Sequence, residues 1–298
     1  MTTQGGWFHQ DDPEYLATRP DDRVSYSVLH KVRDCEHAAL WKHANPRTEV
    51  SDEMRFGSLC DVLLLEPERE KDKIAICPGV GDSGTWSAKY KLEVIAPLEA
   101  EGKICLKEKD LQPARELCES VMQHQGGWIA ERFNLGLPPE RDSGRDTRFQ
   151  QKAWFMDQEQ AVSLRTDWIE FDLDGPIIDI MDLKTATDPS PRAFEAAAWR
   201  LGYWMQAAVY ARAAECIAFE HGELTPAHPR FSWLVVGSKP PYTPCVYEMS
   251  DKYLQWALEE YEVALGNWKQ VKGIPLNQAA DFIGYQEVFG IDLPKWVA

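Results

Sequence analysis

The strongest constraint on the fold of this chain is the segment RTDWIEFDLDGPIIDIMDLKTAT, which spans residues 165–187. Apolar and polar residues alternate on both sides of Asp174-Gly175, and an Asp-Gly pair between two such runs is a strong hairpin signal. The pattern therefore predicts two antiparallel strands, 161–171 and 176–185, joined by a two-residue turn. Pro176 leaves the geometry of that turn open, and a slip of one residue would reverse the face of every side chain.

The predicted hairpin brings charged residues together. Partners placed symmetrically about the turn put Asp167 opposite Asp182 and Arg165 opposite Lys184. Asp182 and Lys184 are two residues apart and therefore share one face of the sheet. Since opposed β-carbons lie about 4.5–5.5 Å apart, two carboxylates and two cations gather on that face.

The remaining pattern predicts an α/β or α+β fold with a central mixed β-sheet flanked by helices. Further predicted elements are helices at 25–43, 52–66, 110–123, 191–220 and 250–271, strands at 151–157, 231–237 and 242–249, and loops at 78–90 and 136–149. We interpret 1–298 as a single domain. It comprises a mainly helical N-terminal region (residues 1–150) that carries the helix of Asp61, a catalytic core (151–272) and a tail (273–298).

Composition limits the functions that the chain can serve. The net charge of −16 and the sequence pI of about 4.9 count against DNA binding, because DNA-binding proteins usually present a basic face. An acidic total still permits a local basic groove, and bound cations offset charge at an active site. The seven cysteines include no CxxC pair, which favours reduced thiols. Without a signal pattern or long apolar run, we expect a cytoplasmic protein with no membrane association.

Two adjacent carboxylates repel each other unless a cation lies between them. Oxygen ligands favour Mg²⁺, with Mn²⁺ as a substitute, and the backbone carbonyl of Leu183 could add a further ligand. Lys184 could orient or deprotonate the attacking water and stabilise negative charge. The alternative is a salt-bridge ladder on an exposed sheet face. The same acid-x-Lys spacing recurs at Glu101-Gly-Lys103, where we expect a solvated turn.

Six segments in order along the chain favour the catalytic interpretation. They are MRFGSLCDVLLLEPE (54–68), RTDW (165–168), IIDIMDLKTATDPSP (177–191), GYWMQAAVY (202–210), PPYTPCVYEM (240–249) and LPKW (293–296). With these segments the chain resembles the PD-(D/E)XK nuclease superfamily, and within it the RecE-like, exodeoxyribonuclease VIII type of prophages and phages.

The resemblance implies a restriction-endonuclease-like core and a Mg²⁺-dependent exonuclease. Such enzymes digest linear double-stranded DNA 5′ to 3′ and leave 3′ single-stranded tails. They form homo-oligomeric rings and cooperate with a single-strand annealing protein in recombination. Carried over by position, Asp167 and Asp182 are metal ligands and Lys184 is the catalytic lysine, while Gln206 and Tyr210 match the Gln-x-x-x-Tyr helix motif of related nucleases. The resemblance also implies the cytoplasm of a bacterium or phage-infected host. The full set of candidate metal ligands is Asp61, Asp167, Asp182 and Leu183, that of catalytic residues is Asp167, Asp182, Lys184, Gln206 and Tyr210, and that of DNA-binding residues is Arg165, Thr185, Tyr203, Gln206 and Tyr210.

One departure from the family pattern concerns Asp61, which stands where relatives commonly have histidine. Aspartate is also a metal ligand, but a solvated residue on the helix surface is the alternative. Two other functions remain open. A nuclease-fold protein without turnover could act as a DNA-end-binding or assembly module, and an acidic protein could mimic DNA.

Overall fold

The computed structural model describes residues 5–9, 12–46, 50–78, 86–136, 144–221 and 228–278. The strands are β1 (Gly5–His9), β2 (Val24–Ser25), β3 (Ile74–Ile76), β4 (Ile104–Leu106), β5 (Arg145–Asp157), β6 (Gln160–Asp172), β7 (Ile177–Ala186), β8 (His228–Gly237) and β9 (Pro244–Glu248). The helices are α1 (Pro13–Thr18), α2 (Tyr26–Asp34), α3 (Glu36–Ala44), α4 (Asp52–Leu65), α5 (Glu70–Lys73), α6 (Ala88–Tyr90), α7 (Ala96–Ala100), α8 (Glu108–Gln123), α9 (Trp128–Arg132), α10 (Pro191–Leu201), α11 (Tyr203–His221) and α12 (Asp251–Val271).

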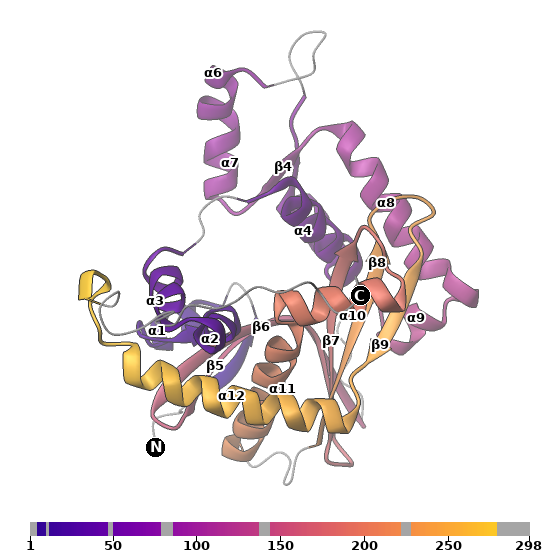
Figure 1. Ribbon diagram of the computed structural model, residues 1–298. Helices are drawn as coiled ribbons and strands as arrows, with labels where there is room; N and C mark the ends of the chain where they lie inside the picture. Colours follow the sequence, from indigo (N-terminus) through magenta and orange to yellow (C-terminus); the bar gives the residue numbers. More distant parts are fainter. Residues whose placement is uncertain are drawn as a thin grey trace, which may run out of the picture.

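A mixed sheet forms the centre of the fold, as predicted (Figure 1). Within the described residues its order is β1-β5-β6-β7-β8-β9, with β2 pairing in parallel with β6. The neighbours β6 and β7 are antiparallel, whereas β7 and β8 are parallel. Helices α10 and α11 connect the two parallel strands, as a parallel connection requires.

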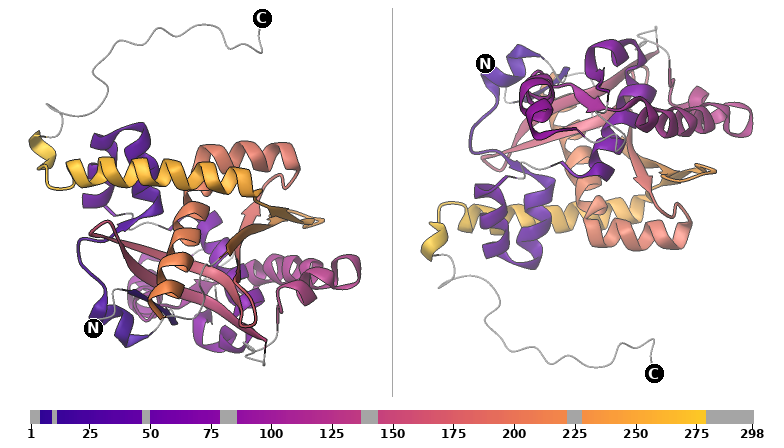
Figure 2. Two further views of the ribbon diagram at one scale, coloured as in Figure 1. Left: turned by 90° about the horizontal axis from the view of Figure 1, so that it is seen from below. Right: turned by 90° about the horizontal axis from the view of Figure 1, so that it is seen from above.

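Two apolar cores cover the two faces of the sheet. One core packs α2, α11 and α12 against the sheet around Trp204, Tyr261 and Trp268, and the other packs α4, α8 and α9 around Leu64, Leu117 and Phe133. The long helix α12 crosses α11 on the first face (Figure 2). The short parallel pair β3–β4 forms a small lobe with α6 and α7, next to the start of α4.

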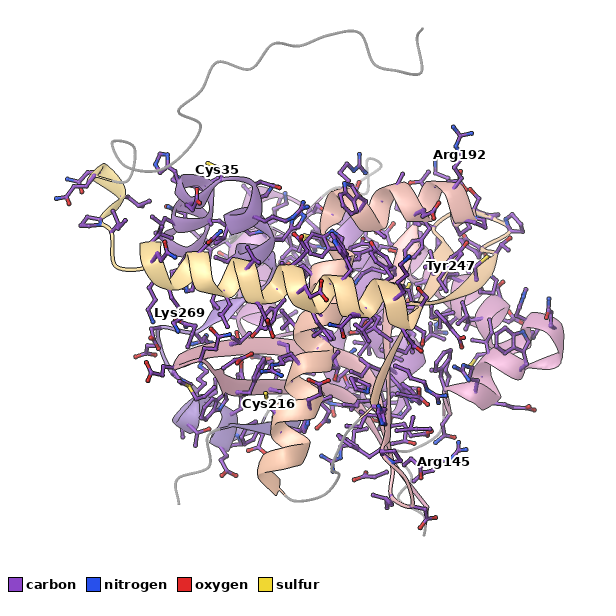
Figure 3. All side chains as sticks on the ribbon, turned by 60° about the horizontal axis from the view of Figure 1, so that its bottom comes forward. Cys35, Arg145, Arg192, Cys216, Tyr247 and Lys269 are labelled. Atoms are coloured by element: carbon purple, nitrogen blue, oxygen red, sulfur yellow. The ribbon has the colours of Figure 1, made fainter. Side chains whose placement is uncertain are left out.

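Contacts at the sheet edge hold α10 in place. The hydroxyl of Tyr247 on β9 donates a hydrogen bond to the carbonyl of Pro189 (2.6 Å), and its ring stacks on Phe194 with the centroids 4.7 Å apart (Figure 3). Helix α10 ends at Gly202, whose φ of +74° favours glycine. A β-carbon at Gly202 would lie 2.5 Å from Cγ of His30, so both the backbone and the packing require glycine at the start of α11.

The structure corrects several predicted elements. The helix predicted at 25–43 is interrupted at Cys35, which is extended (φ −165°, ψ 114°), and the one at 191–220 is interrupted at Gly202. Strand β5 begins at Arg145, inside the predicted loop 136–149, and α8 begins at Glu108 rather than after Asp110. The start of β5 depends on its pairing with β6, where Arg145 lies opposite Asp172, and local residue preference does not report such long-range pairing.

Other predicted elements agree with the structure. Helix α4 ends just before Pro67, and Ser250 caps α12, which extends to Val271. The N-terminal region also contributes strands β1 and β2 to the main sheet, and β5 spans the boundary drawn at residue 150. Residues 79–85 of the predicted loop 78–90 lie outside the described residues, and its end forms helix α6 (Ala88–Tyr90) instead. Most of the tail, including LPKW, also lies outside the described residues. No helix among the described residues has the length and apolar character needed to cross a bilayer.

Candidate active site

The candidate site lies where strands β6 and β7 separate. Their ladder pairs Trp168 with Met181 and Phe171 with Ile178, which is the register predicted from Asp174-Gly175. The connection is longer than predicted, because β6 ends at Asp172 and β7 begins at Ile177. The register nevertheless holds, since the longer connection has the same centre.

Beyond Met181, the ladder joins β7 to β8 only. The backbone N–H of Leu183 donates instead to Oδ2 of Asp167 at 2.8 Å. Asp167 and Asp182 are 5% and 2% exposed, so both carboxylates face the buried wedge between the strands. The prediction that Arg165 lies opposite Lys184 is wrong, because the strands have separated by that level.

Lys184 forms an ion pair with Oδ2 of Asp182, and its ammonium lies 4.8 Å from the ring centroid of Tyr203. Burial raises the pKa of Asp182 to about 6, although the charge of Lys184 opposes this shift. Burial lowers the pKa of Lys184, because it disfavours the charged ammonium. The negative charge of Asp182, with smaller contributions from Tyr26 and Asp167, outweighs burial, so the pKa of Lys184 is raised. In this arrangement Lys184 is therefore a cation and not a proton acceptor.

Gln206 of α11 holds the same carboxylate, and Tyr210, one turn later, is hydrogen-bonded to Gln206. Nε2 of Gln206 donates to Oδ1 of Asp182 at 2.7 Å and to the hydroxyl of Tyr210 at 3.0 Å. The hydroxyl of Tyr210 in turn donates to the backbone carbonyl of Arg165. Both side chains are 3% exposed, so the predicted helix pair orients Asp182 and the edge of β6.

Asp61 reaches the site from α4. Its side chain is 18% exposed, and its Oδ2 lies 3.5 Å from Nη2 of Arg165. Burial raises the pKa of Asp61 well above the usual carboxyl range, and the negative charge of Asp167 adds to the shift. Asp61 therefore points into the wedge, as its place at the edge of the apolar helix face predicts.

A cavity of about 400 Å³ unites these groups. Its lining is Ser25, Tyr26, Asp61, Ser163, Leu164, Arg165, Asp167, Asp182, Leu183, Lys184, Gln206 and Tyr210. Two predicted site residues are not part of this lining. The ring of Tyr203 lies against the ammonium of Lys184, and Thr185 lines a neighbouring cavity.

Sequence reasoning missed Gln150 and Tyr26, and also three other residues that line the cavity, Ser25, Ser163 and Leu164. Gln150 is 2% exposed and donates to Oδ1 of Asp167 at 3.3 Å. Tyr26 begins α2 and meets the ring of Tyr210 edge-on, with the centroids 6.4 Å apart. A polar residue before the strand 151–157 was the available signal for Gln150. Nothing near Tyr26 in the sequence connects it to Asp182.

The donor chemistry fits a hard divalent cation, because three carboxylates face the cavity and none of the described residues that line it is histidine or cysteine. Oε1 of Gln206 and Oδ2 of Asp182 are buried and accept no hydrogen bond from the described residues, although the latter contacts the Lys184 ammonium. The spacing is less favourable. In the described parts of the chain, no three His, Cys, Asp or Glu side chains are grouped closely enough to hold one metal ion. A cation at this site therefore requires the ion pairs of Lys184 and Arg165 to rearrange.

Comparisons with known proteins identify the fold and leave the family open. No protein-family model matches the chain, and no curated protein does. A solved structure from Eubacterium rectale, described as a candidate exonuclease, superimposes with a TM-score of 0.54 at 13% identity and covers 96% of this chain and 97% of that one. SSO0001 (TM-score 0.26, 13% identity, 80% and 84% coverage) and VC1899 from Vibrio cholerae (0.22, 10%, 91% and 58%) are too dissimilar to support an argument. The first likeness shows that the chain shares the fold of the candidate exonuclease.

Proposed function

We propose that this chain is a metal-dependent DNA nuclease that hydrolyses phosphodiester bonds. The observation that supports this most is the convergence of Asp61, Asp167, Asp182 and Lys184 on one cavity at the separation of two strands. Arg165 and Lys184 supply positive charge in the same cavity. A surface salt-bridge ladder does not account for this arrangement, because Asp167 and Asp182 are nearly fully buried.

Each residue has a distinct task in this proposal. Asp61, Asp167 and Asp182 would hold Mg²⁺, or Mn²⁺ in its place, with the carbonyl of Leu183 as a further ligand. The cation supplies Lewis-acid activation of the phosphate and lowers the pKa of a bound water. Gln206 and Gln150 fix the carboxylate orientations through hydrogen bonds.

The positive charge of Lys184 suits stabilisation of the negative charge that develops on the phosphate oxygens. The guanidinium of Arg165 is 47% exposed at the cavity, which suits contact with the DNA backbone. A role for Lys184 as proton acceptor would require release from Asp182 first, because that ion pair raises its pKa.

The finer proposal is an exonuclease of RecE-like type. It would digest linear duplex DNA from 5′ to 3′, act as a homo-oligomeric ring and supply 3′ tails to a single-strand annealing protein. Its support is the order of the six sequence segments and the shared fold with a candidate exonuclease. A ring would also retain DNA despite the net charge of −16.

End-labelled linear duplex, covalently closed circular duplex and single-stranded DNA test the proposal. We expect degradation of the linear duplex with Mg²⁺, none with EDTA, and none with Asp182→Asn. Labels at the 5′ and 3′ ends report polarity, and analytical ultracentrifugation reports the oligomeric state. Undiminished cleavage by Asp182→Asn would refute the site assignment.

One observation favours a second function, a DNA-end-binding module without turnover. Lys184 forms an ion pair with Asp182, and Arg165 forms one with Asp61. Among the described residues, no three possible ligands are grouped closely enough to hold a metal ion. Binding of linear DNA with no cleavage under any divalent cation would establish this alternative.

A further inference from the structure

A second cavity adjoins the candidate active site and shares two elements with it. It has a volume of about 620 Å³ and lies between the first half of α4, the end of β7 and the lobe of β3–β4. Helix α4 contributes Phe56 here and Asp61 to the active site, and β7 contributes Thr185 here and Asp182 to the active site. Gly57 of α4 faces Thr185 of β7, where a β-carbon would lie in ordinary contact, 3.7 Å from Oγ1 of Thr185.

The spacing between the two cavities matches a few nucleotides of one DNA strand. Phe56 lies about 7.5 Å from Asp61 along the axis of α4, at roughly 1.5 Å per residue. Thr185 and Asp182 are three residues apart on β7 and therefore point to opposite faces of that strand, so α4, which lines both cavities, sets the spacing. Stacked nucleotides rise by about 3.4 Å each along one strand, so the second cavity is about two nucleotides from the candidate catalytic carboxylates.

The lining of this cavity suits a nucleobase better than a phosphate. Phe56, Leu59 and Trp86 form apolar and aromatic walls, and the indole N–H of Trp86 is fixed by a hydrogen bond to the carbonyl of Cys77 at 3.2 Å. Bases stack favourably on such aromatic side chains, whatever their sequence. The volume exceeds that of a single base and leaves room for its sugar.

The charges of the lining agree with this assignment. Asp52, Glu53 and Asp110 contribute three carboxylates against the two cations Arg55 and Lys107. Both cations are engaged, since Arg55 binds the carbonyl of Cys105 at 3.1 Å and pairs with Glu99 at 3.3 Å, while Lys107 lies 5.6 Å from the Trp86 ring centroid. A phosphate would be repelled, whereas the amino and imino N–H groups of a base find carboxylate acceptors.

We propose that this cavity receives an unpaired base of the DNA strand whose backbone lies at Asp182. The inference rests on the proposed nuclease function and deepens it, because it gives the enzyme a site for strand that is no longer paired. Trp86 and Phe56 would then keep a separated base out of the duplex.

A base-deletion series tests the proposal by binding, separately from cleavage. The probe is a dye-labelled single-stranded 12-nucleotide DNA, measured by fluorescence anisotropy with Ca²⁺ in place of Mg²⁺, together with versions that lack one base each. In the wild-type protein we expect one or two abasic positions to weaken binding by about 5- to 100-fold, the range for one stacked base. Trp86→Ala should weaken the intact strand by a similar factor and the abasic strand no further.

Matched variants control for damage to the fold. Trp128→Ala removes a tryptophan that is 38% exposed, more than the half-buried Trp86, from a separate groove beside α9 and should leave all affinities unchanged. Trp86→Phe and Phe56→Ala also weaken stacking on the base. Neither removes the whole Trp86 side chain from the core of the small lobe. A variant that simply unfolds would lose affinity for intact and abasic strands alike.

The outcomes separate this inference from the proposed function. Equal effects at every abasic position, equal weakening of both strands by Trp86→Ala, or no binding of the oligonucleotide would each overturn it. Cleavage of duplex DNA without any coupling between Trp86 and the missing base would leave the nuclease proposal standing alone. Coupling without cleavage would support the base site and favour the module without turnover.

Discussion

Replacing Asp182 by asparagine should change how stability depends on pH. The carboxyl is 2% exposed, and burial raises its pKa from 3.8 to about 6. Because the folded protein binds this proton more tightly than the unfolded chain, Asp182 favours the folded state below pH 4, and this contribution is lost as pH rises through about 6. At about 1.36 kcal/mol per pKa unit, the loss amounts to about 3 kcal/mol.

Urea denaturation in EDTA, followed by circular dichroism from pH 4 to 7.5, measures this loss. Relative to Asp182→Asn, the wild-type free energy of unfolding should fall by about 3 kcal/mol over that range. Asp174→Asn, which removes an exposed carboxyl in the connection between β6 and β7, controls for the general loss of one charge. Parallel wild-type and Asp182→Asn curves would refute the view that this ionised carboxylate is costly without a cation. Mg²⁺ at pH 7.5 should raise the melting temperature of the wild type and not of Asp182→Asn.

Three further predictions concern the surroundings of this carboxylate. Lys184→Ala should lower turnover by roughly 100-fold or more in single-turnover cleavage assays, as for loss of one electrostatic group. Lys184→Arg should not restore it, because a planar guanidinium does not reproduce the compact ammonium that pairs with Asp182 beside the ring of Tyr203; a fully active arginine variant would show that any cation at this position suffices. Asp61→Asn should raise the Mg²⁺ requirement, whereas Asp61→His should shift the preference towards Mn²⁺; identical activity titrations for all three proteins would mean that Asp61 binds no metal. Gly202→Ala should lower the free energy of unfolding, measured by urea denaturation, by about 1–3 kcal/mol for the positive φ alone. Adding His30→Ala should restore only the stability lost to the steric clash with His30; an unchanged stability of Gly202→Ala would contradict the packing at the start of α11.

The register of the hairpin was predictable because it depends on a local signal. Asp174-Gly175 marks the centre of the connection between β6 and β7, and alternation fixes the face of each residue. The true connection is longer, yet it is symmetric about the same point, so Trp168 still pairs with Met181. The placement of Asp167 beside Asp182 therefore survived an error in the turn itself.

The separation of the two strands was not predictable from the same pattern. The N–H of Leu183 donates to the carboxylate of Asp167 instead of to a backbone carbonyl of β6. Where the strands have separated, Arg165 pairs with Asp61 and does not lie opposite Lys184. A tertiary contact with α4, more than a hundred residues away in the chain, decides that outcome. Tyr26 entered the site in the same way, because α2 meets α11 only in the folded protein.

The charges of the cavity indicate that so acidic a chain would bind DNA at this site only when a divalent cation is bound there. Asp61, Asp167 and Asp182 contribute three negative charges when ionised, and Arg165 and Lys184 contribute two positive ones. The remaining charge is −1, so a phosphodiester, itself −1, is repelled by the cavity as described. One divalent cation would reverse the sign to +1 at the point where a phosphate must bind. With a net charge of −16 over the whole chain, no long-range attraction compensates for an empty site. The same carboxylates that would hold the cation therefore also make productive DNA binding conditional on it.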